Sequence, residues 1–172
     1  SVSYSGLVRT TTVAPDTPDM KVTTFTSDAA GRLVEVRDAK NQVTSYGYDT
    51  ADRIENVTHP GSGQPSREWH YNGLGWLTSL VQPESGTTSY SEFHVTGKPG
   101  RTIYADGSIL STGYDSLGRP TGVSGSGVSQ HFGYDQPGQG LATGKLTSSS
   151  DQGVSLSWSY GNAGGRLSDL VT

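Results

Sequence analysis

Cysteine is absent from this chain of 172 residues, so the sequence predicts neither a disulfide framework nor a metal site or nucleophile built on cysteine. Apolar residues make up only 31% of the chain, and no apolar run is long enough to cross a membrane. No stretch shows helical periodicity, and the 24 glycines disfavour helices on propensity alone. These absences argue against membrane insertion and against a helical fold.

Charge is also scarce. The 12 Lys and Arg residues are dispersed and are outnumbered by 16 acidic residues, which gives a net charge of -4. Nucleic-acid binding needs clustered cations that displace counterions, so no nucleic-acid partner is expected. The chain begins at Ser1 and its only methionine is Met20, and no segment reads as a signal sequence. We therefore expect an excised or processed piece of a longer protein.

A motif of nine residues recurs about every twenty residues along the chain. Its clearest copy is Tyr46-Gly-Tyr-Asp-Thr-Ala-Asp-Arg-Ile54, which has Val57 three residues further on. Taking the aspartate position of each copy as 28, 49, 72, 96, 115, 135 and 161, the steps are 21, 23, 24, 19, 20 and 26 residues. An irregular period of this size predicts an array of supersecondary units with variable loops.

Turn chemistry explains why these residue types recur. In Asp-x-x-Gly, the carboxylate accepts a hydrogen bond from the backbone amide two residues on, and the glycine adopts a positive φ. The aromatic-x-aromatic pair before the turn points both rings to one sheet face, so each copy reads as strand, hairpin turn, strand. Leu33 and Val36 beyond the turn have opposite parity, which requires either a bulge or partial cover on both faces. The connections between copies, such as 38–41 and 83–86, are also turn-like but variable.

We assign the repeated positions a structural role. The residues in these positions are Asp28, Gly31, Arg32, Tyr48, Asp49, Arg53, Tyr71, Asn72, Gly75, Tyr114, Asp115, Gly118, Arg119, Tyr134, Asp135, Tyr160 and Arg166. In the degraded fourth copy, Thr96 takes the aspartate position and Arg101 the arginine position, while the second copy has Asp52 where glycine is expected. An arginine beside a tyrosine predicts a guanidinium over the ring of the same or the adjacent unit.

The tandem aromatic-x-Tyr-Asp-x-x-Gly-Arg-Leu units resemble the YD repeat, also called the RHS repeat. This family includes bacterial Rhs proteins, the B and C components of insecticidal toxin complexes, wall-associated polymorphic toxins and teneurins. The resemblance covers about residues 23 to 170, and it implies a ribbon of β-hairpins that spirals into a hollow shell around a C-terminal effector. The Asp-Pro-rich motif of the self-cleavage region that ends such shells is missing here, so the chain is expected to supply shell wall only.

The expected fold is all-β, with tandem hairpin repeats forming a curved, spiralling antiparallel sheet that is a segment of a hollow shell. Residues 1–22 are expected to be a partial N-terminal repeat or lead-in strand. Residues 23–172 are expected to hold about seven repeats in a single array. By resemblance, the protein is expected to be bacterial and to be secreted or exposed on the cell surface.

Catalytic chemistry is not indicated. The four histidines are scattered, the acidic residues are mostly committed to turns, and no Gly-x-Ser-x-Gly elbow occurs. We therefore expect no enzyme, no cofactor and no metal site. Two functions stay open. The first is a structural wall whose partners are the rest of the parent chain and an enclosed effector polypeptide. The second is a carbohydrate-binding or adhesion module, for which Trp76 is the best contact candidate because it stands where arginine is expected, although packing would also explain it.

Overall fold

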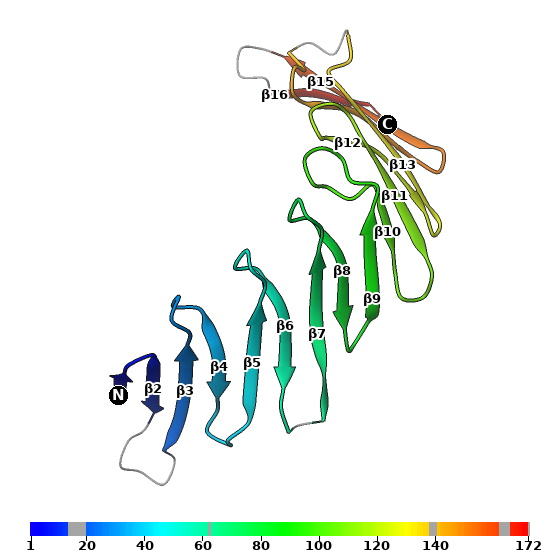
Figure 1. The fold of residues 1–172 in the computed structure, drawn as a ribbon. Coiled ribbons are helices and arrows are strands. Elements are labelled where there is room, and N and C mark those ends of the chain that lie inside the picture. The colour runs from blue at the N-terminus through cyan, green and yellow to red at the C-terminus, as the bar shows by residue number, and fades with distance from the viewer. Residues whose placement is uncertain (14–19, 62, 138–140, 162–165, 172) are drawn as a thin grey trace. The chain divides into compact units, whose positions relative to one another are not determined.

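The computed structural model describes residues 1–13, 20–61, 63–137, 141–161 and 166–171. The regular structure in these ranges is β-strand (Figure 1), which confirms the predicted all-β class. None of the described residues forms a helix that is long and apolar enough to cross a membrane. The chain divides into two compact units, residues 1–87 and 88–172, and each is described by itself.

In the first unit, each strand pairs antiparallel with the next strand in the chain. Its strands are β1 (Val2–Ser5), β2 (Val8–Val13), β3 (Lys21–Ser27), β4 (Leu33–Arg37), β5 (Val43–Tyr48), β6 (Ile54–His59), β7 (Gln64–Tyr71) and β8 (Leu77–Gln82). This order is that of a meander of hairpins, as the repeats predict.

The second unit follows the same rule of sequential antiparallel pairing. Its strands are β9 (Gly86–Ser91), β10 (Arg101–Ile103), β11 (Ile109–Tyr114), β12 (Pro120–Gly125), β13 (Val128–Tyr134), β14 (Leu146–Asp151), β15 (Val154–Gly161) and β16 (Arg166–Val171). The division of the chain into a lead-in of residues 1–22 and an array over 23–172 stays a prediction.

A one-residue bulge recurs in six hairpins. The register shift lies directly before the last residue of the incoming strand in five of them, and before Tyr160, the second-last residue of β15, in the sixth. In the hairpin of β5 and β6, Gly47 lies opposite Asn56 while Tyr48 lies opposite Ile54, so Glu55 is the extra residue. A bulge of this kind resets the alternation of side chains. The bulge explains why Leu33 and Val36 can share a face although their positions have opposite parity. They lie opposite Ser27 and Phe25, which are two residues apart in β3 and therefore point to the same side.

The bulge gathers the rings and the aliphatic residues on one side of each sheet, which we call the aromatic face. In the first unit, Trp69 lies opposite Leu80 and Tyr71 opposite Leu77. In the second unit, Tyr134 lies opposite Leu146. The other side, which we call the opposite face, carries the alternate residues of the same strands.

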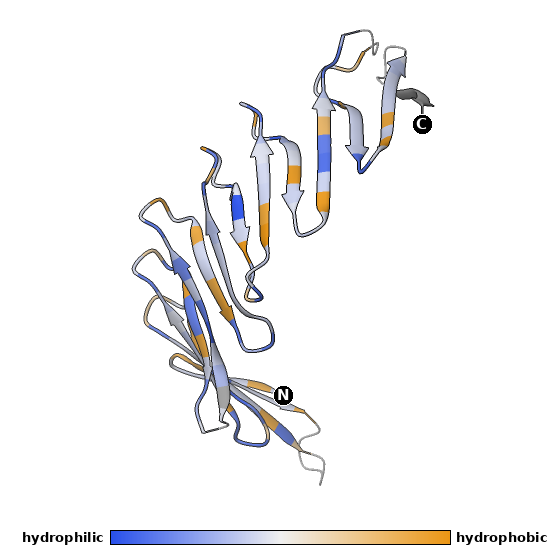
Figure 2. Ribbon diagram, turned by 90° about the vertical axis from the view of Figure 1, so that its right-hand side faces the viewer, coloured by the Kyte–Doolittle hydropathy of each residue, from blue (hydrophilic) through white to orange (hydrophobic). Residues whose placement is uncertain are grey.

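Neither unit has a thick hydrophobic core among its described residues. Where exposure is described, only Gly118, Ala142 and Thr147 are buried, and the strand residues are mostly half-buried. Figure 2 shows apolar and polar residues interspersed along the strands of both units. A sheet with light cover on each face needs few apolar residues, which accounts for the apolar content of 31%.

Candidate functional site

The first turn of the array shows how the aspartate works. Oδ1 of Asp28 accepts hydrogen bonds from the backbone N–H groups of Ala30 and Arg32, each at 2.9 Å. Oδ2 accepts a hydrogen bond from Nε of Arg32 at 2.7 Å. These bonds, the one from the Arg32 side chain above all, hold the pKa of Asp28 below its ordinary value. One carboxylate therefore fixes the turn backbone and also aims the arginine.

The same turn recurs at residues 49–53 and 115–119. Asp49 and Asp115 each accept two backbone N–H bonds and a side-chain bond at 2.7 Å from the arginine four residues on. Gly118 has a φ of 73°, and its N–H donates to the carbonyl of Asp115 at 2.9 Å. A residue without a side chain fits this conformation best.

Asn72 keeps this turn without a charge. Its Oδ1 accepts the N–H groups of Leu74 and Trp76, each at 3.0 Å, so the amide replaces the carboxylate. Trp76 is half-buried at the arginine position of this turn. Its role as a ligand contact stays a prediction.

Asp52 takes the glycine position of its turn and has a φ of 62°, which few residues other than glycine and asparagine or aspartate adopt readily. Its carboxylate accepts a hydrogen bond from Nη1 of Arg32, which belongs to the preceding repeat. Asp52 thus adopts a less favourable backbone conformation than glycine would, and its side chain forms an ion pair with Arg32 of the preceding repeat. Gly75 takes the next such position, where a Cβ would lie 2.7 Å from Nη1 of Arg53.

The turn cations lie over the tyrosine rings of the repeats that follow. Cζ of Arg53 lies 4.3 Å from the ring centroid of Tyr71, and Cζ of Arg119 lies 4.3 Å from that of Tyr134. Both distances are within the range of a cation–π contact. The contact joins adjacent repeats, which settles the alternative left by the sequence. We call each cation with the ring it covers a repeat joint, and the joints are Arg32–Tyr48, Arg53–Tyr71, Lys98–Tyr114, Arg119–Tyr134 and Lys145–Tyr160.

The tyrosine hydroxyls add a second link between repeats. The hydroxyl of Tyr48 donates to the carbonyl of Leu33 at 2.8 Å, and that of Tyr71 donates to Ile54 at 3.1 Å. Tyr114 and Tyr160 donate in the same way to Pro99 and Leu146. In each case the acceptor is the residue directly after the turn cation. The ring and the hydroxyl thus hold both sides of the preceding turn.

An ion pair strengthens the joint between the fifth and sixth repeats. Nη2 of Arg119 lies 2.7 Å from Oδ2 of Asp135, while its Nε binds Asp115. The Arg119 side chain holds the pKa of Asp135 below its ordinary value, and Asp135 in turn raises the pKa of Arg119. Arg119 therefore connects two aspartates and one ring.

The assignment of the fourth repeat was wrong by two residues. The bonds of the turn run from His94 N–H to the carbonyl of Lys98 and from Gly97 N–H to the carbonyl of His94, each at 2.9 Å. His94 therefore takes the aspartate position, where its Nδ1 accepts the N–H of Thr96 at 3.3 Å. The cation of this turn is Lys98 and not Arg101, which lies in β10 opposite Ser91. The spacing of Gly97 and Lys98 was the signal that could have found this register.

The sixth repeat keeps its joint although eight residues separate Asp135 from Gly144, where the other turns have two. Asp135 N–H donates to the carbonyl of Lys145 at 3.3 Å, and Oδ1 of Asp135 accepts the N–H of Gly144. Nζ of Lys145 lies 5.0 Å from the ring centroid of Tyr160. Ala142 and Thr147, both buried, pack at this turn. The insertion therefore extends the turn without displacing its ends.

The remaining assigned residues are placed as follows. Gly31 has a φ of 85° in the turn of Asp28. Arg166 begins β16 opposite Gly161, and its side chain lies outside the described residues, as does the turn before it. Asp38 was not assigned to the motif, yet it binds the N–H groups of Lys40 and Gln42 in the same manner as Asp28. That the assigned residues hold the repeats together is our proposal, which the variants below test.

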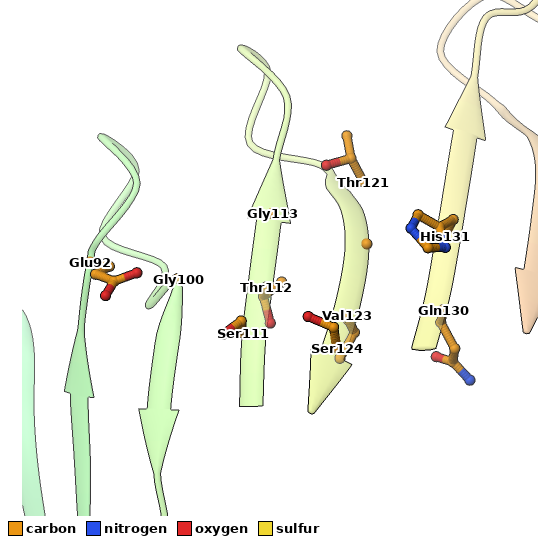
Figure 3. A pocket seen from close by; sticks show the side chains of 11 residues that line it. Glu92, Gly100, Ser111, Thr112, Gly113, Thr121, Val123, Ser124, Gln130 and His131 are labelled. Carbon is orange, nitrogen blue, oxygen red and sulfur yellow. The ribbon is translucent and has the colours of Figure 1, made fainter. Parts of the chain in front are cut away.

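A shallow hollow of about 430 Å³ lies on the opposite face of the second unit, away from the joints (Figure 3). It is lined by hydroxyl-bearing and glycine residues of β11 and β12, such as Ser111, Gly113 and Ser124. Glu92 and His131 lie at opposite ends of it, with β11 and β12 between them. Among the described residues, no three His, Asp or Glu side chains gather as metal ligands. The hollow therefore brings no acid and base together.

These observations define a class, an array of β-hairpins in which five turns place a cation over the ring of the hairpin that follows. Residues 28–64 match the family model described as RHS Repeat, which is the family that the tandem motifs resemble.

Solved toxin structures share the fold at low identity. The chain is similar to a mutant Tc holotoxin pore from Photorhabdus luminescens, with 16% identity, a TM-score of 0.59, and 95% of this chain and 10% of that one covered. It is also similar to TcdB2-TccC3-TEV, with 17% identity, a TM-score of 0.63, and coverage of 95% and 10%. TcdB2-TccC3 without its hypervariable C-terminal region matches at 15% identity and a TM-score of 0.54, with coverage of 94% and 12%. The chain thus spans about a tenth of the length of these proteins.

Proposed function

We propose that the chain is a structural segment of a shell wall in an Rhs-type or toxin-complex-type protein, and that the wall encloses a C-terminal effector polypeptide. The observation that carries the proposal is the series of repeat joints, in which each turn cation covers the ring of the next repeat. Stability in such an array comes from nearest-neighbour contacts, so a wall can extend without a central core.

The thinness of each sheet supports this role. Its residues are mostly half-buried, with few buried residues among those described. A sheet of this kind is suited to separating two spaces, because neither face packs against a second layer formed by the described residues of its own unit (Figure 1). We propose a scaffold role and assign no catalytic residue.

Partners and location follow from the same proposal. The similar TcdB2-TccC3 protein has a hypervariable C-terminal region, so we propose that the parent chain likewise carries a variable effector beyond its repeats. The rest of the parent chain would then continue the wall. We propose that the parent protein is bacterial and is secreted or exposed at the cell surface.

The test uses two neighbouring positions that face opposite ways. Ser148 and Ser149 are consecutive in β14, and Ser148 lies opposite Gly133 while Ser149 lies opposite Phe132. Each is replaced in turn by a photo-crosslinking amino acid in the complete parent protein, and the crosslinked peptides are identified by mass spectrometry. A wall predicts that only one of the two positions crosslinks to the effector polypeptide. Crosslinks from both positions, or from neither, would contradict an enclosing wall.

A further inference from the structure

One position of the repeat array lacks the ring that every other repeat carries. The residue before the turn aspartate, or before its replacement, is aromatic in six repeats, and these residues are Tyr48, Tyr71, Phe93, Tyr114, Tyr134 and Tyr160. In the first repeat this residue is Ser27. Ser27 lies opposite Leu33, as Tyr48 lies opposite Ile54, so the strand register is that of the other repeats.

A hollow of about 500 Å³ opens at this position, between the first repeat and the hairpin of β1 and β2. Its lining is largely apolar, and the residues that matter here are Tyr4, Leu7, Arg9, Phe25, Ser27 and Leu33. The exposed fractions are 75% for Tyr4 and 53% for Leu7, which are high values for large apolar side chains. Covering them would remove apolar surface from water.

The hollow also carries the cation that this chain places over aromatic rings. Arg9 lies opposite Tyr4 on one side and opposite Phe25 on the other, and its Cζ is 4.1 Å from the Phe25 ring centroid. The side chain is exposed, so a second ring can approach the guanidinium. A phenol ring suits both features, because its flat apolar body packs on Leu33 and its negative face attracts the cation.

We infer that this hollow binds a tyrosine side chain of the enclosed polypeptide. The chain itself places tyrosine in this position in five other repeats, where a cation covers the ring. The inference that the hollow binds a phenol ring follows from its lining. That the ring belongs to the enclosed polypeptide rests on the proposed function. Binding there would anchor the enclosed polypeptide at one ring, in the manner of an aromatic hot spot.

The site is tested with 4-methylphenol, which carries the tyrosine ring and no backbone. In a titration followed by NMR, we expect shifts centred on the amides of Leu7, Phe25 and Leu33, and nuclear Overhauser contacts to the Leu7 and Leu33 methyl groups. Affinity should be roughly millimolar, as suits a fragment with so few atoms. 4-Methylcyclohexanol, which lacks the aromatic ring, should bind more weakly. Equal binding of the two probes, or shifts scattered over the chain, would overturn the assignment.

Ser27→Tyr supplies the ring from within and should weaken binding of 4-methylphenol at least about tenfold, because the new side chain fills the hollow. Thr26→Tyr is the matched control, since Thr26 lies opposite Glu35 and its side chain is on the opposite face. It should leave binding unchanged. Unchanged binding in Ser27→Tyr would place the probe elsewhere. Should Ser27→Tyr fail to fold, the contacts to Leu7 and Leu33 in the unsubstituted chain decide the question.

The source of the ring is tested in the complete parent protein with a photo-crosslinking residue at Leu7. Crosslinks to a tyrosine-containing peptide of the effector are expected. Crosslinks to a second copy of the chain would overturn this source. Because the probe titration contains no effector, its failure would overturn the site and leave the wall proposal standing.

Discussion

Two turns of the second unit lie side by side yet use different chemistry. In the turn of residues 115–119, the Asp115 carboxylate binds two backbone N–H groups and Nε of Arg119. In the turn of residues 94–98, a histidine nitrogen accepts one N–H at 3.3 Å, and the cation is a lysine. Nζ of Lys98 donates to the carbonyl of Gly118 at 2.7 Å, so the second turn contacts the first. Both turns have the same two backbone hydrogen bonds, one from the first residue to the fifth and one from the fourth residue to the first.

The comparison shows which features these two turns share and which differ. The backbone conformation and a cation near the next ring are kept in both turns, whereas the carboxylate and the planar guanidinium are not. Nζ of Lys98 lies 5.9 Å from the ring centroid of Tyr114, whereas Cζ of Arg119 lies 4.3 Å from that of Tyr134. A lysine is a point charge and cannot bind an acid and stack on a ring as arginine does. We therefore expect the turn of residues 94–98 to be the weaker of the two.

Acid should produce the largest effect, because it acts on every carboxylate turn at once. Hydrogen bonds from the following arginine hold the pKa of Asp28, Asp49 and Asp115 below the ordinary value. Their contribution to stability is complete above a pH of about 4, near the pKa of an unfolded aspartate, and is lost as the pH falls through the lower pKa of the folded chain. The melting temperature, followed by circular dichroism, should fall steeply below pH ~4. Asp115→Asn should show a shallower fall, and a melting temperature constant across this range would contradict the role of the carboxylates.

Among single substitutions in these turns, Gly118→Ala should be the most damaging. It places a side chain at a φ of 73°, with its Cβ 3.1 Å from Cγ2 of Thr96 in the neighbouring turn. Gly107→Ala is the control, since Gly107 has a φ of 81° and a Cβ there meets nothing within 4 Å. Both variants bear the backbone strain of about 1–2 kcal/mol, and only Gly118→Ala adds a contact. Equal free energies of unfolding for the two variants would show that the close contact between position 118 and Thr96 costs no stability.

Asp115→Ala should destabilise the unit more than His94→Ala does. The first change removes three hydrogen bonds, one of them to a charged group, and releases Arg119 from its own turn. The second removes one long hydrogen bond from Thr96 N–H, a contact with the Thr96 hydroxyl and a tilted ring contact with Tyr114. Urea denaturation of the two variants makes the comparison. A larger loss in His94→Ala would reverse the ranking of the turns.

Arg53→Ala should have a moderate effect in the first unit. It removes the contact over Tyr71, about 0.5–1 kcal/mol at an exposed site, and frees Asp49 from its partner. Arg37→Ala is a matched control, because Arg37 pairs with Glu35 at the surface and covers no ring among the described contacts. Thermal unfolding of both variants tests the joint. A melting temperature unchanged by Arg53→Ala would rule out a stabilising role for it.

His94→Asp should give the smallest effect, and in the opposite direction. The substitution restores the carboxylate at the aspartate position, where Lys98 is the cation of the turn. The expected gain is about 0.5 kcal/mol, within the range of a single hydrogen bond. A slightly higher denaturation midpoint at neutral pH, with the gain lost in acid, would support the comparison. A loss of stability would show that the ring of His94, 5.5 Å from that of Tyr114, contributes more than its hydrogen bond.

Local chemistry made the hairpins predictable. The Asp49 turn and the parity of Tyr46 and Tyr48 depend on residues close in sequence, so the motif was sufficient to find them. The register of the fourth repeat was missed because His94 and Lys98 replace the expected residues, while Arg101 stood nearby as a false match.

The sequence predicted that an arginine covers a tyrosine ring, but it could not decide between the same and the adjacent repeat, because contacts between repeats depend on how neighbouring strands align. The ion pair of Arg32 with Asp52 joins residues twenty positions apart, and only the pairing of the intervening strands brings them together. It explains an aspartate that had looked out of place in a turn. The turn at residues 38–41 was predicted, but its use of the same aspartate hydrogen bonds was not, since Asn41 fills the glycine position with a φ of 60°.

The insertion after Asp135 has a practical consequence for protein engineering. Because the N–H of Asp135 donates to the carbonyl of Lys145, as the aspartate N–H does to the arginine carbonyl in the other turns, the flanking strands keep the register of those hairpins. Foreign peptides could be grafted between these anchors, in place of natural loop residues, without redesigning the sheet.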